Sequence, residues 1–124
     1  MVEPSDKKLT LIKNYVQKYC QRTGLQLHSM PDVSEAVMKG LASHMEELGR
    51  PLCPCRFYED KQAEVEKREW LCPCNDMKQY KYCHCMLFVT DKDFPVTEHL
   101  PEGHDGKEVY GLITDPAPEK GRLK

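Results

Sequence analysis

The sequence predicts a mainly α fold, in which a small all-helical domain with irregular loops is followed by a loop-rich C-terminal tail. Two amphipathic segments near the N-terminus and a stretch of strong helix formers farther along favour helices. Prolines and glycines recur after residue 94, which is typical of loops and turns. With 124 residues, the chain is most simply one domain. We assign residues 1–94 to its main body and residues 95–124 to an extension of the same domain.

The first helix is expected from residue 5 to about residue 22. Its apolar side chains recur every three or four residues, on one face of the helix, at Leu9, Ile12, Val16 and Tyr19. Ser5 is the expected N-cap and Gly24 the expected C-terminal stop. Cys20, on the last turn, is expected to be a small buried apolar side chain, because free cysteine is among the most buried residue types.

The second helix is expected to begin after Pro31. Asp32 and Glu35 have the spacing of a capping box, and Gly49 ends the helix. Its apolar side chains again follow helical spacing, at Val33, Val37, Leu41, Met45 and Leu48. His44 lies off this stripe, so we expect a surface histidine or a buried one with a hydrogen-bond partner.

Two shorter helical segments are expected between the cysteine pairs. Residues 58–69 are rich in helix formers and in opposite charges three or four residues apart, which predicts a solvated spacer helix. Residues 75–82 can make one or two turns, with Asn75 as the N-cap.

The tail after residue 94 is expected to consist of loops and turns. Its apolar segment at residues 109–113 suggests an edge strand or hairpin arm. His99 and His104 also lie in the tail; they could bind metal, but two histidines in a polar loop usually do not.

Charge and hydropathy exclude several classes of protein. Basic residues number 18 and acidic residues 20, a net charge of −2, so the basic surface of a nucleic-acid-binding protein is not expected. No apolar run approaches the roughly 20 residues that span a membrane. The first residues lack the pattern of a signal or transit peptide, which predicts a cytoplasmic, reducing environment.

Six of the seven cysteines occur as three Cys-x-Cys pairs. The pairs are Cys53-Pro54-Cys55, Cys72-Pro73-Cys74 and Cys83-His84-Cys85. A proline between two cysteines fixes its φ angle and removes an amide donor, which holds a bent segment that aims the flanking thiols. In a reducing compartment, such a density of cysteines indicates metal binding or redox chemistry rather than a disulfide framework.

The spacing favours an iron–sulfur cluster over zinc. Structural zinc sites usually take cysteines two to four residues apart, whereas these cysteines are one residue apart. A four-iron cluster takes four thiolates. Six cysteines would then leave two for thiol chemistry.

These segments resemble the catalytic chain of ferredoxin:thioredoxin reductase. The resemblance rests on Leu52-Cys53-Pro54-Cys55-Arg56, Cys72-Pro73-Cys74 and Cys83-His84-Cys85-Met86-Leu87-Phe88. It extends through Glu46-Glu47-Leu48-Gly49 and Tyr58-Glu59-Asp60-Lys61, and it covers roughly residues 5–94.

The resemblance implies a role for each of the six cysteines. Cys53, Cys72, Cys74 and Cys83 would be the ligands of a [4Fe–4S] cluster around which the helical domain folds. Cys55 and Cys85 would form the redox-active disulfide, with Cys55 as the nucleophile. His84 would assist proton transfer, as a side chain that titrates near neutral pH can.

The implied activity is that of an iron–sulfur disulfide reductase. It would take single electrons from ferredoxin and reduce the disulfide of thioredoxin or a thioredoxin-like protein. A variable subunit or self-association is left open, and neither nucleic acid nor a membrane is an expected partner. The alternative is a non-catalytic zinc or iron–sulfur binding module with two idle thiols.

Overall fold

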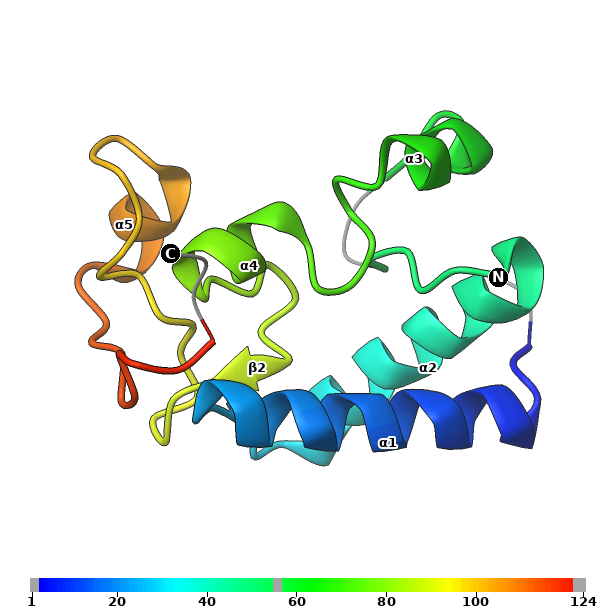
Figure 1. Ribbon diagram of the computed structural model, residues 1–124, viewed down its shortest axis with the longest axis horizontal. Helices are drawn as coiled ribbons and strands as arrows, with labels where there is room; N and C mark the ends of the chain where they lie inside the picture. The colour runs from blue at the N-terminus through cyan, green and yellow to red at the C-terminus, as the bar shows by residue number, and fades with distance from the viewer. Residues whose placement is uncertain (1–2, 55–56, 122–124) are drawn as a thin grey trace.

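The computed structural model describes residues 3–54 and 57–121 (Figure 1). Within these ranges the chain is mostly helical, as predicted, with one small sheet and long loops. The helices are α1 (Asp6–Thr23), α2 (Pro31–Leu48), α3 (Lys61–Lys67), α4 (Asn75–Tyr80) and α5 (Asp105–Tyr110). The strands are β1 (Gln26–Leu27) and β2 (Phe88–Val89). No helix in the described part of the chain is long and apolar enough to cross a membrane.

The helix α1 forms with the ends that its sequence predicts. The Ser5 hydroxyl accepts a hydrogen bond from the Lys8 amide, and Gly24 ends the helix in the left-handed conformation at φ 74°. The predicted apolar face packs against α2, with Ile12 and Val16 buried (Figure 1). Cys20 packs against the core, as expected of an apolar side chain, but it is only partly buried.

The start of α2 differs from the prediction. The N-cap is Met30, whose side chain makes no capping bond, and Asp32 lies inside the first turn. Pro31 occupies the first turn because its fixed φ suits a helix and its missing N–H needs no partner there. The predicted capping box at Asp32 and Glu35 was therefore wrong, whereas the stop at Gly49 is confirmed. His44 is buried, and its Nδ1 lies 2.7 Å from the Leu52 carbonyl oxygen.

The two short helices between the cysteine pairs are present. The helix α3 has no buried residue, as expected of a solvated spacer, and the Asp60 carboxylate caps its start. The N-cap of α4 is Cys74 rather than Asn75, which is its first helical residue. The predicted N-cap was therefore one residue too late. Cys74 is a poor capping residue, but the cysteine-rich segment before it holds it at this position.

The sheet and the last helix were not predicted. Strands β1 and β2 pair antiparallel, with Gln26 opposite Val89 and Leu27 opposite Phe88. Residues 105–110 form α5 instead of the predicted edge strand at 109–113. The His104 side chain caps the helix by accepting a hydrogen bond from the Gly106 amide. In a strand, this amide would need a partner on a distant segment of the chain.

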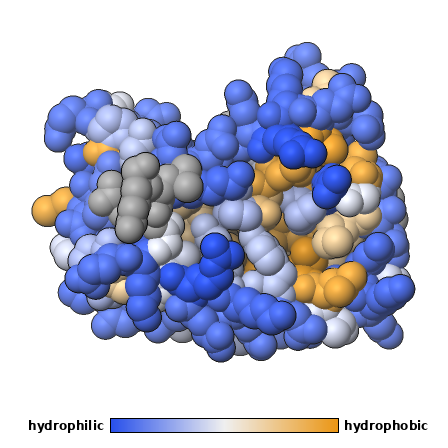
Figure 2. Space-filling model, viewed as in Figure 1, coloured by the Kyte–Doolittle hydropathy of each residue, from blue (hydrophilic) through white to orange (hydrophobic). Residues whose placement is uncertain are grey.

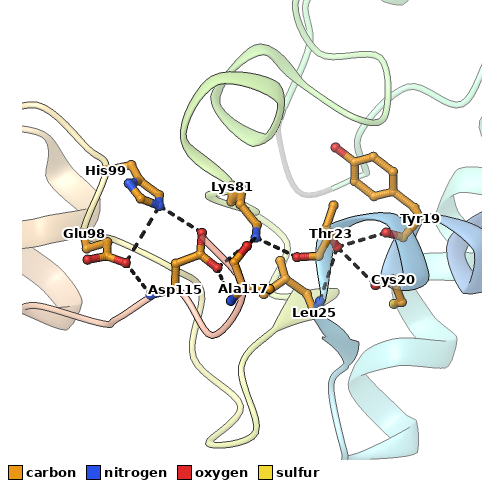
Figure 3. Close-up of polar contacts among 9 residues, drawn as sticks. All are labelled: Tyr19, Cys20, Thr23, Leu25, Lys81, Glu98, His99, Asp115 and Ala117. Carbon is orange, nitrogen blue, oxygen red and sulfur yellow. Dashed lines mark hydrogen bonds and ion pairs between the residues drawn. The ribbon is translucent and has the colours of Figure 1, made fainter. Parts of the chain in front are cut away.

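The tail returns to the body of the protein through a buried lysine (Figure 3). The Lys81 ammonium donates to the Thr23 carbonyl oxygen at 2.6 Å, to Asp115 Oδ1 at 2.8 Å and to the Ala117 carbonyl oxygen at 2.9 Å. Asp115 also lies 2.9 Å from His99 Nε2 through its other oxygen. One buried cation thus joins the end of α1, the end of α4 and the tail.

The neighbouring acids and histidine do not form an open cation site. Donor atoms of Glu98, His99 and Asp115 lie within 4.8 Å of one another. However, Asp115 is already neutralised by Lys81, and His99 Nε2 faces the Asp115 carboxylate. This group of side chains is better described as a hydrogen-bonded anchor for the tail.

Candidate functional site

The sulfur-bearing side chains gather at one apolar cavity. Cysteines from all three pairs line it, together with Val37 and Leu41 of α2 and Leu87 and Phe88 beside β2. The cysteines are Cys53, Cys72, Cys74, Cys83 and Cys85. Figure 2 shows apolar residues gathered in a hollow between α3 and the layer of α1 and α2, on a face that is otherwise mainly hydrophilic.

Backbone pairing brings the first two cysteine pairs together. Leu52 and Leu71 form an isolated antiparallel bridge. On either side of it, the Cys53 amide donates to the Trp70 carbonyl oxygen at 2.8 Å, and the Cys72 amide donates to the Pro51 carbonyl oxygen at 2.9 Å. Cys53 and Cys72 are therefore held on two backbone segments that lie side by side.

A glycine on α2 lets the first pair approach closely. A Cβ atom at Gly40 would lie 2.5 Å from Cβ of Pro54, well inside van der Waals contact. The proline between Cys53 and Cys55 therefore packs directly on the helix. This contact fixes the segment that carries the first pair.

The helix α4 joins the second pair to the third. Cys74 is its N-cap, and Lys81 ends it in the left-handed conformation at φ 60°. The chain thereby turns back within a few residues, and Cys83 reaches the cavity already lined by Cys74. Both cysteines are buried.

Burial raises the pKa of three cysteines at this cavity. It raises the pKa of Cys72 well above its ordinary value and that of Cys74 to about 12. Burial also raises the pKa of Cys83, although the backbone amides of residues 85–88 act in the opposite direction by donating toward its sulfur. Buried thiols in an apolar pocket become thiolates when a metal replaces their protons, so this donor set fits a thiolate-bound metal or cluster.

Cys85 differs from the cysteines around it. It is disulfide-bonded, whereas Cys72, Cys74 and Cys83 have free thiols. Its sulfur also lies 2.9 Å from the sulfur of Cys53. The predicted partner Cys55 lies outside the described residues. The disulfide bond of Cys85 therefore lies directly beside the other cysteines of the cavity.

His84 lines the same cavity and has a polar partner outside it. Its Nε2 lies 2.8 Å from Asp76 Oδ2, and the rings of Trp70 and Tyr82 contact it edge to face. About a quarter of the side chain is exposed, with a relative accessibility of 27%. A histidine so placed contacts both solvent and the cysteine cavity.

Sequence reasoning missed two side chains of this site. The Tyr15 hydroxyl donates to the sulfur of Cys72 at 3.8 Å, and Asp76 holds His84. Tyr15 lies four residues before Tyr19, on which its ring stacks, so an aromatic pair at helical spacing was the available signal. Nothing in the sequence singles out Asp76, because its contacts depend on how the chain folds back.

Comparisons with known proteins point to one family. The family model described as ferredoxin thioredoxin reductase catalytic beta chain matches residues 2–102. The chain is 52% identical over 91 residues to the ferredoxin-thioredoxin reductase catalytic chain of Synechocystis, covering 73% of this chain and 77% of that one. It is 46% identical over 97 residues to a chloroplastic catalytic chain of Glycine max, covering 77% and 67%. It is 41% identical over 95 residues to the catalytic chain of Guillardia theta, covering 76% and 93%.

The fold and the site together define a small helical protein with cysteines of three Cys-x-Cys pairs gathered at one cavity. The family match and the similar chains identify one particular family. The chain belongs to the family of ferredoxin-thioredoxin reductase catalytic chains, and the resemblance found in its sequence is confirmed. Membership implies an iron–sulfur cofactor.

Proposed function

We propose that this chain is an iron–sulfur disulfide reductase. It takes single electrons from ferredoxin through a [4Fe–4S] cluster and uses a Cys55–Cys85 disulfide to reduce thioredoxin or a thioredoxin-like protein. The observation that carries the proposal is the juxtaposition at one cavity of disulfide-bonded Cys85 with the sulfurs of Cys53, Cys72, Cys74 and Cys83.

Four of these cysteines are the proposed cluster ligands, namely Cys53, Cys72, Cys74 and Cys83. They line a mainly apolar cavity, and burial disfavours the ionisation of Cys72, Cys74 and Cys83 without a bound cation. The bound cluster would supply electrons one at a time to the neighbouring disulfide. The helical body would then fold around the cluster, as the sequence led us to expect.

Cys55 and Cys85 are the proposed redox pair. Cys85 supports this assignment because it is disulfide-bonded, while Cys20, Cys72, Cys74 and Cys83 have free thiols. After two electrons and two protons have opened the bond, the Cys55 thiolate attacks the target disulfide and releases one target thiol. The Cys85 thiolate then attacks the mixed disulfide, which releases the second target thiol and restores the Cys55–Cys85 bond.

His84 is the proposed proton carrier for these thiols. It lines the cavity beside Cys85 and is partly exposed to solvent. A neutral imidazole accepts a proton on one nitrogen while the other donates a hydrogen bond, so it can exchange protons between water and a thiol.

Partners and compartment follow from the family and from thiol chemistry. The names of the similar chains contain ferredoxin and thioredoxin, which we take as electron donor and acceptor, and their description as catalytic chains favours a further subunit in the assembly. Dense cysteines that bind a metal or do redox chemistry suit a reducing compartment, which we take to be the cytoplasm. We treat residues 95–124 as an extension of the catalytic domain at 1–94, because Lys81 binds Asp115.

The decisive experiment is reduction of a thioredoxin by the purified holoprotein with photoreduced ferredoxin. The proposal requires brown protein with about four irons and four sulfides per chain. Cys55→Ser should abolish the mixed disulfide with the target, whereas Cys85→Ser should trap it through Cys55. Exchanged phenotypes would reverse the two roles, and colourless zinc protein without activity would support the alternative of a structural metal module.

A further inference from the structure

A side chain of the tail reaches the polar partner of His84. His104 Nε2 lies 3.1 Å from Asp76 Oδ2, the oxygen that also lies 2.8 Å from His84 Nε2. One carboxylate oxygen therefore bridges two histidines from segments far apart in the sequence. All three side chains are partly buried, with relative accessibilities of 27% for His84, 26% for Asp76 and 19% for His104.

The hydrogen-bond pattern fixes the tautomer of His104. Its Nδ1 accepts a hydrogen bond from the Gly106 amide at 3.0 Å. An accepting nitrogen carries no proton, so the proton of the neutral ring is on Nε2, which donates to Asp76. The N-cap of α5 thus directs an N–H group of the tail at the carboxylate.

The same carboxylate selects the tautomer of His84. A carboxylate oxygen only accepts, so His84 Nε2 carries a proton and donates it to Asp76, and in the neutral ring the lone pair is on Nδ1. His84 lines the cysteine cavity. An imidazole held at one nitrogen by an acid keeps its orientation and its tautomer, as in hydrolase triads and metal sites.

Aromatic packing supports this arrangement from the other side. The Tyr82 ring contacts both histidines edge to face, at centroid distances of 4.7 Å to His84 and 5.4 Å to His104. A Cβ atom at Gly106 would lie 2.8 Å from the Tyr82 ring, so a glycine there lets the first turn of α5 approach Tyr82. This approach brings His104 within reach of Asp76.

We infer that Asp76 and His104 are positioning residues for His84, and that the tail thereby tunes the proton carrier of the disulfide reductase. Asp76 holds the His84 ring with Nε2 protonated, and His104 holds Asp76. The inference rests on the proposed function for its effect on turnover, but the hydrogen-bond arrangement can be tested without turnover.

The first test is histidine-selective ¹⁵N NMR of the oxidised holoprotein. We expect both His84 and His104 to carry a proton on Nε2 and to donate it to Asp76. In Asp76→Asn, the His84 resonance should shift toward a mixture of tautomers. An unchanged His84 tautomer in Asp76→Asn would overturn the inference, whether or not the protein reduces thioredoxin.

The second test is a set of kinetic variants with the cluster content measured in each. Asp76→Asn should lower kcat for thioredoxin reduction about 10–100-fold with KM unchanged, as is typical when the partner of a functional side chain is lost. His104→Ala should lower it less, and the double variant should be no worse than Asp76→Asn, because His104 acts through Asp76. His104→Gln should restore most of the loss, since its amide can donate to Asp76.

Asp105→Asn is the matched control, because it neutralises a neighbouring exposed acid in the first turn of α5. It should leave kcat and KM unchanged. Additive effects of Asp76→Asn and His104→Ala, or loss of cluster in step with activity, would show a purely structural role and contradict the inference. A wild-type protein that is inactive but shows the expected tautomers would instead reject the proposed function alone.

Discussion

Lys81 and Asp115 form an ion pair of 2.8 Å in which neither side chain is exposed to solvent. Burial alone would raise the pKa of Asp115, but hydrogen bonds from Lys81, the Ala117 amide and His99 hold that pKa below its ordinary value. Lys81 also occupies the left-handed region at φ 60°, which is unfavourable for a residue with a Cβ atom. The tail therefore stabilises a strained turn two residues before Cys83.

Asp115→Asn should strongly destabilise the protein. It leaves the buried ammonium of Lys81 without its counterion, and loss of one partner of a buried pair typically costs about 3–5 kcal/mol. Urea unfolding should show this loss. Glu3→Gln is the control, because it breaks an exposed pair with Lys39 that is worth less than about 1 kcal/mol. Equal effects of the two variants would show that the buried pair contributes no more than the surface one.

Gly24→Ala should destabilise the protein more than Gly49→Ala. Both glycines end long helices in the left-handed conformation, at φ 74° and 77°, so each alanine should cost about 1–2 kcal/mol in backbone strain. A Cβ atom at position 24 would also lie 2.3 Å from Cβ of Ala117, whereas nothing lies within 4 Å at position 49. The clash should add about 1–3 kcal/mol.

Thermal unfolding of these two glycine variants measures how firmly the tail packs on α1. Equal losses would indicate that residues around Ala117 move away at little cost. The comparison isolates the tail because the backbone strain is nearly the same at both positions.

Tyr15→Phe should lower the reduction potential of the cluster. The variant removes the hydroxyl that donates to the Cys72 sulfur, and such hydrogen bonds favour the reduced, more negative state. A bond worth about 0.5–1.5 kcal/mol corresponds to about 20–60 mV for one electron. Potentiometric titration measures the shift. Tyr19→Phe is the control, because it removes an adjacent hydroxyl and leaves the contact between Tyr15 and Cys72 in place; an equal shift there would refute the assignment.

Cys20 should react slowly with iodoacetamide near neutral pH. Burial raises its pKa to about 11, so at pH 8 it has roughly 100-fold less thiolate than an ordinary cysteine. Because its pKa is raised, its alkylation rate should rise about tenfold per pH unit up to pH 10, where an ordinary thiol has levelled off. Peptide mass spectrometry follows the reaction, and Cys20→Ser identifies the peptide. A plateau near pH 9 would contradict a raised pKa.

Removal of iron should loosen the segment from residue 50 to residue 85. The cysteine-bearing backbone there is joined by bonds between loops, such as that between the Cys53 amide and the Trp70 carbonyl oxygen. Metal sites of this kind contribute roughly 10 kcal/mol or more to small domains. Hydrogen exchange should therefore rise across this segment after chelation, with α1 as the internal reference. Unchanged protection would mean that the fold does not depend on the cluster.

The sequence predicts the long helices well because their signals are local. Gly24 and Gly49 end α1 and α2 as expected, and the spacing of Ile12 and Val16 identifies the buried face. The start of α2 was missed because Pro31 and Asp32 are both favourable near a helix N-terminus. The free energies of alternative N-cap positions differ by only a few tenths of a kcal/mol to about 1 kcal/mol, so the sequence does not decide between neighbouring residues.

Features that depend on distant segments could not be predicted in the same way. Strand β2 pairs with β1 across about sixty residues, and both strands are too short to show a period. The cysteine pairs identify the family, but the contact of Asp76 with His104 depends on where α5 packs. Lysine is normally exposed, so no sequence rule predicts the burial of Lys81.

The dependence of Lys81 on Asp115 also has an evolutionary consequence. The family match ends at residue 102, before Asp115 is reached. A homologue that lacks this part of the tail has no carboxylate for a lysine at position 81, and there the ammonium would remain buried without a counterion. We therefore expect the two positions to vary together: a homologue with the lysine should have a carboxylate in the tail, and a homologue without that carboxylate should have a glycine or asparagine at the same turn.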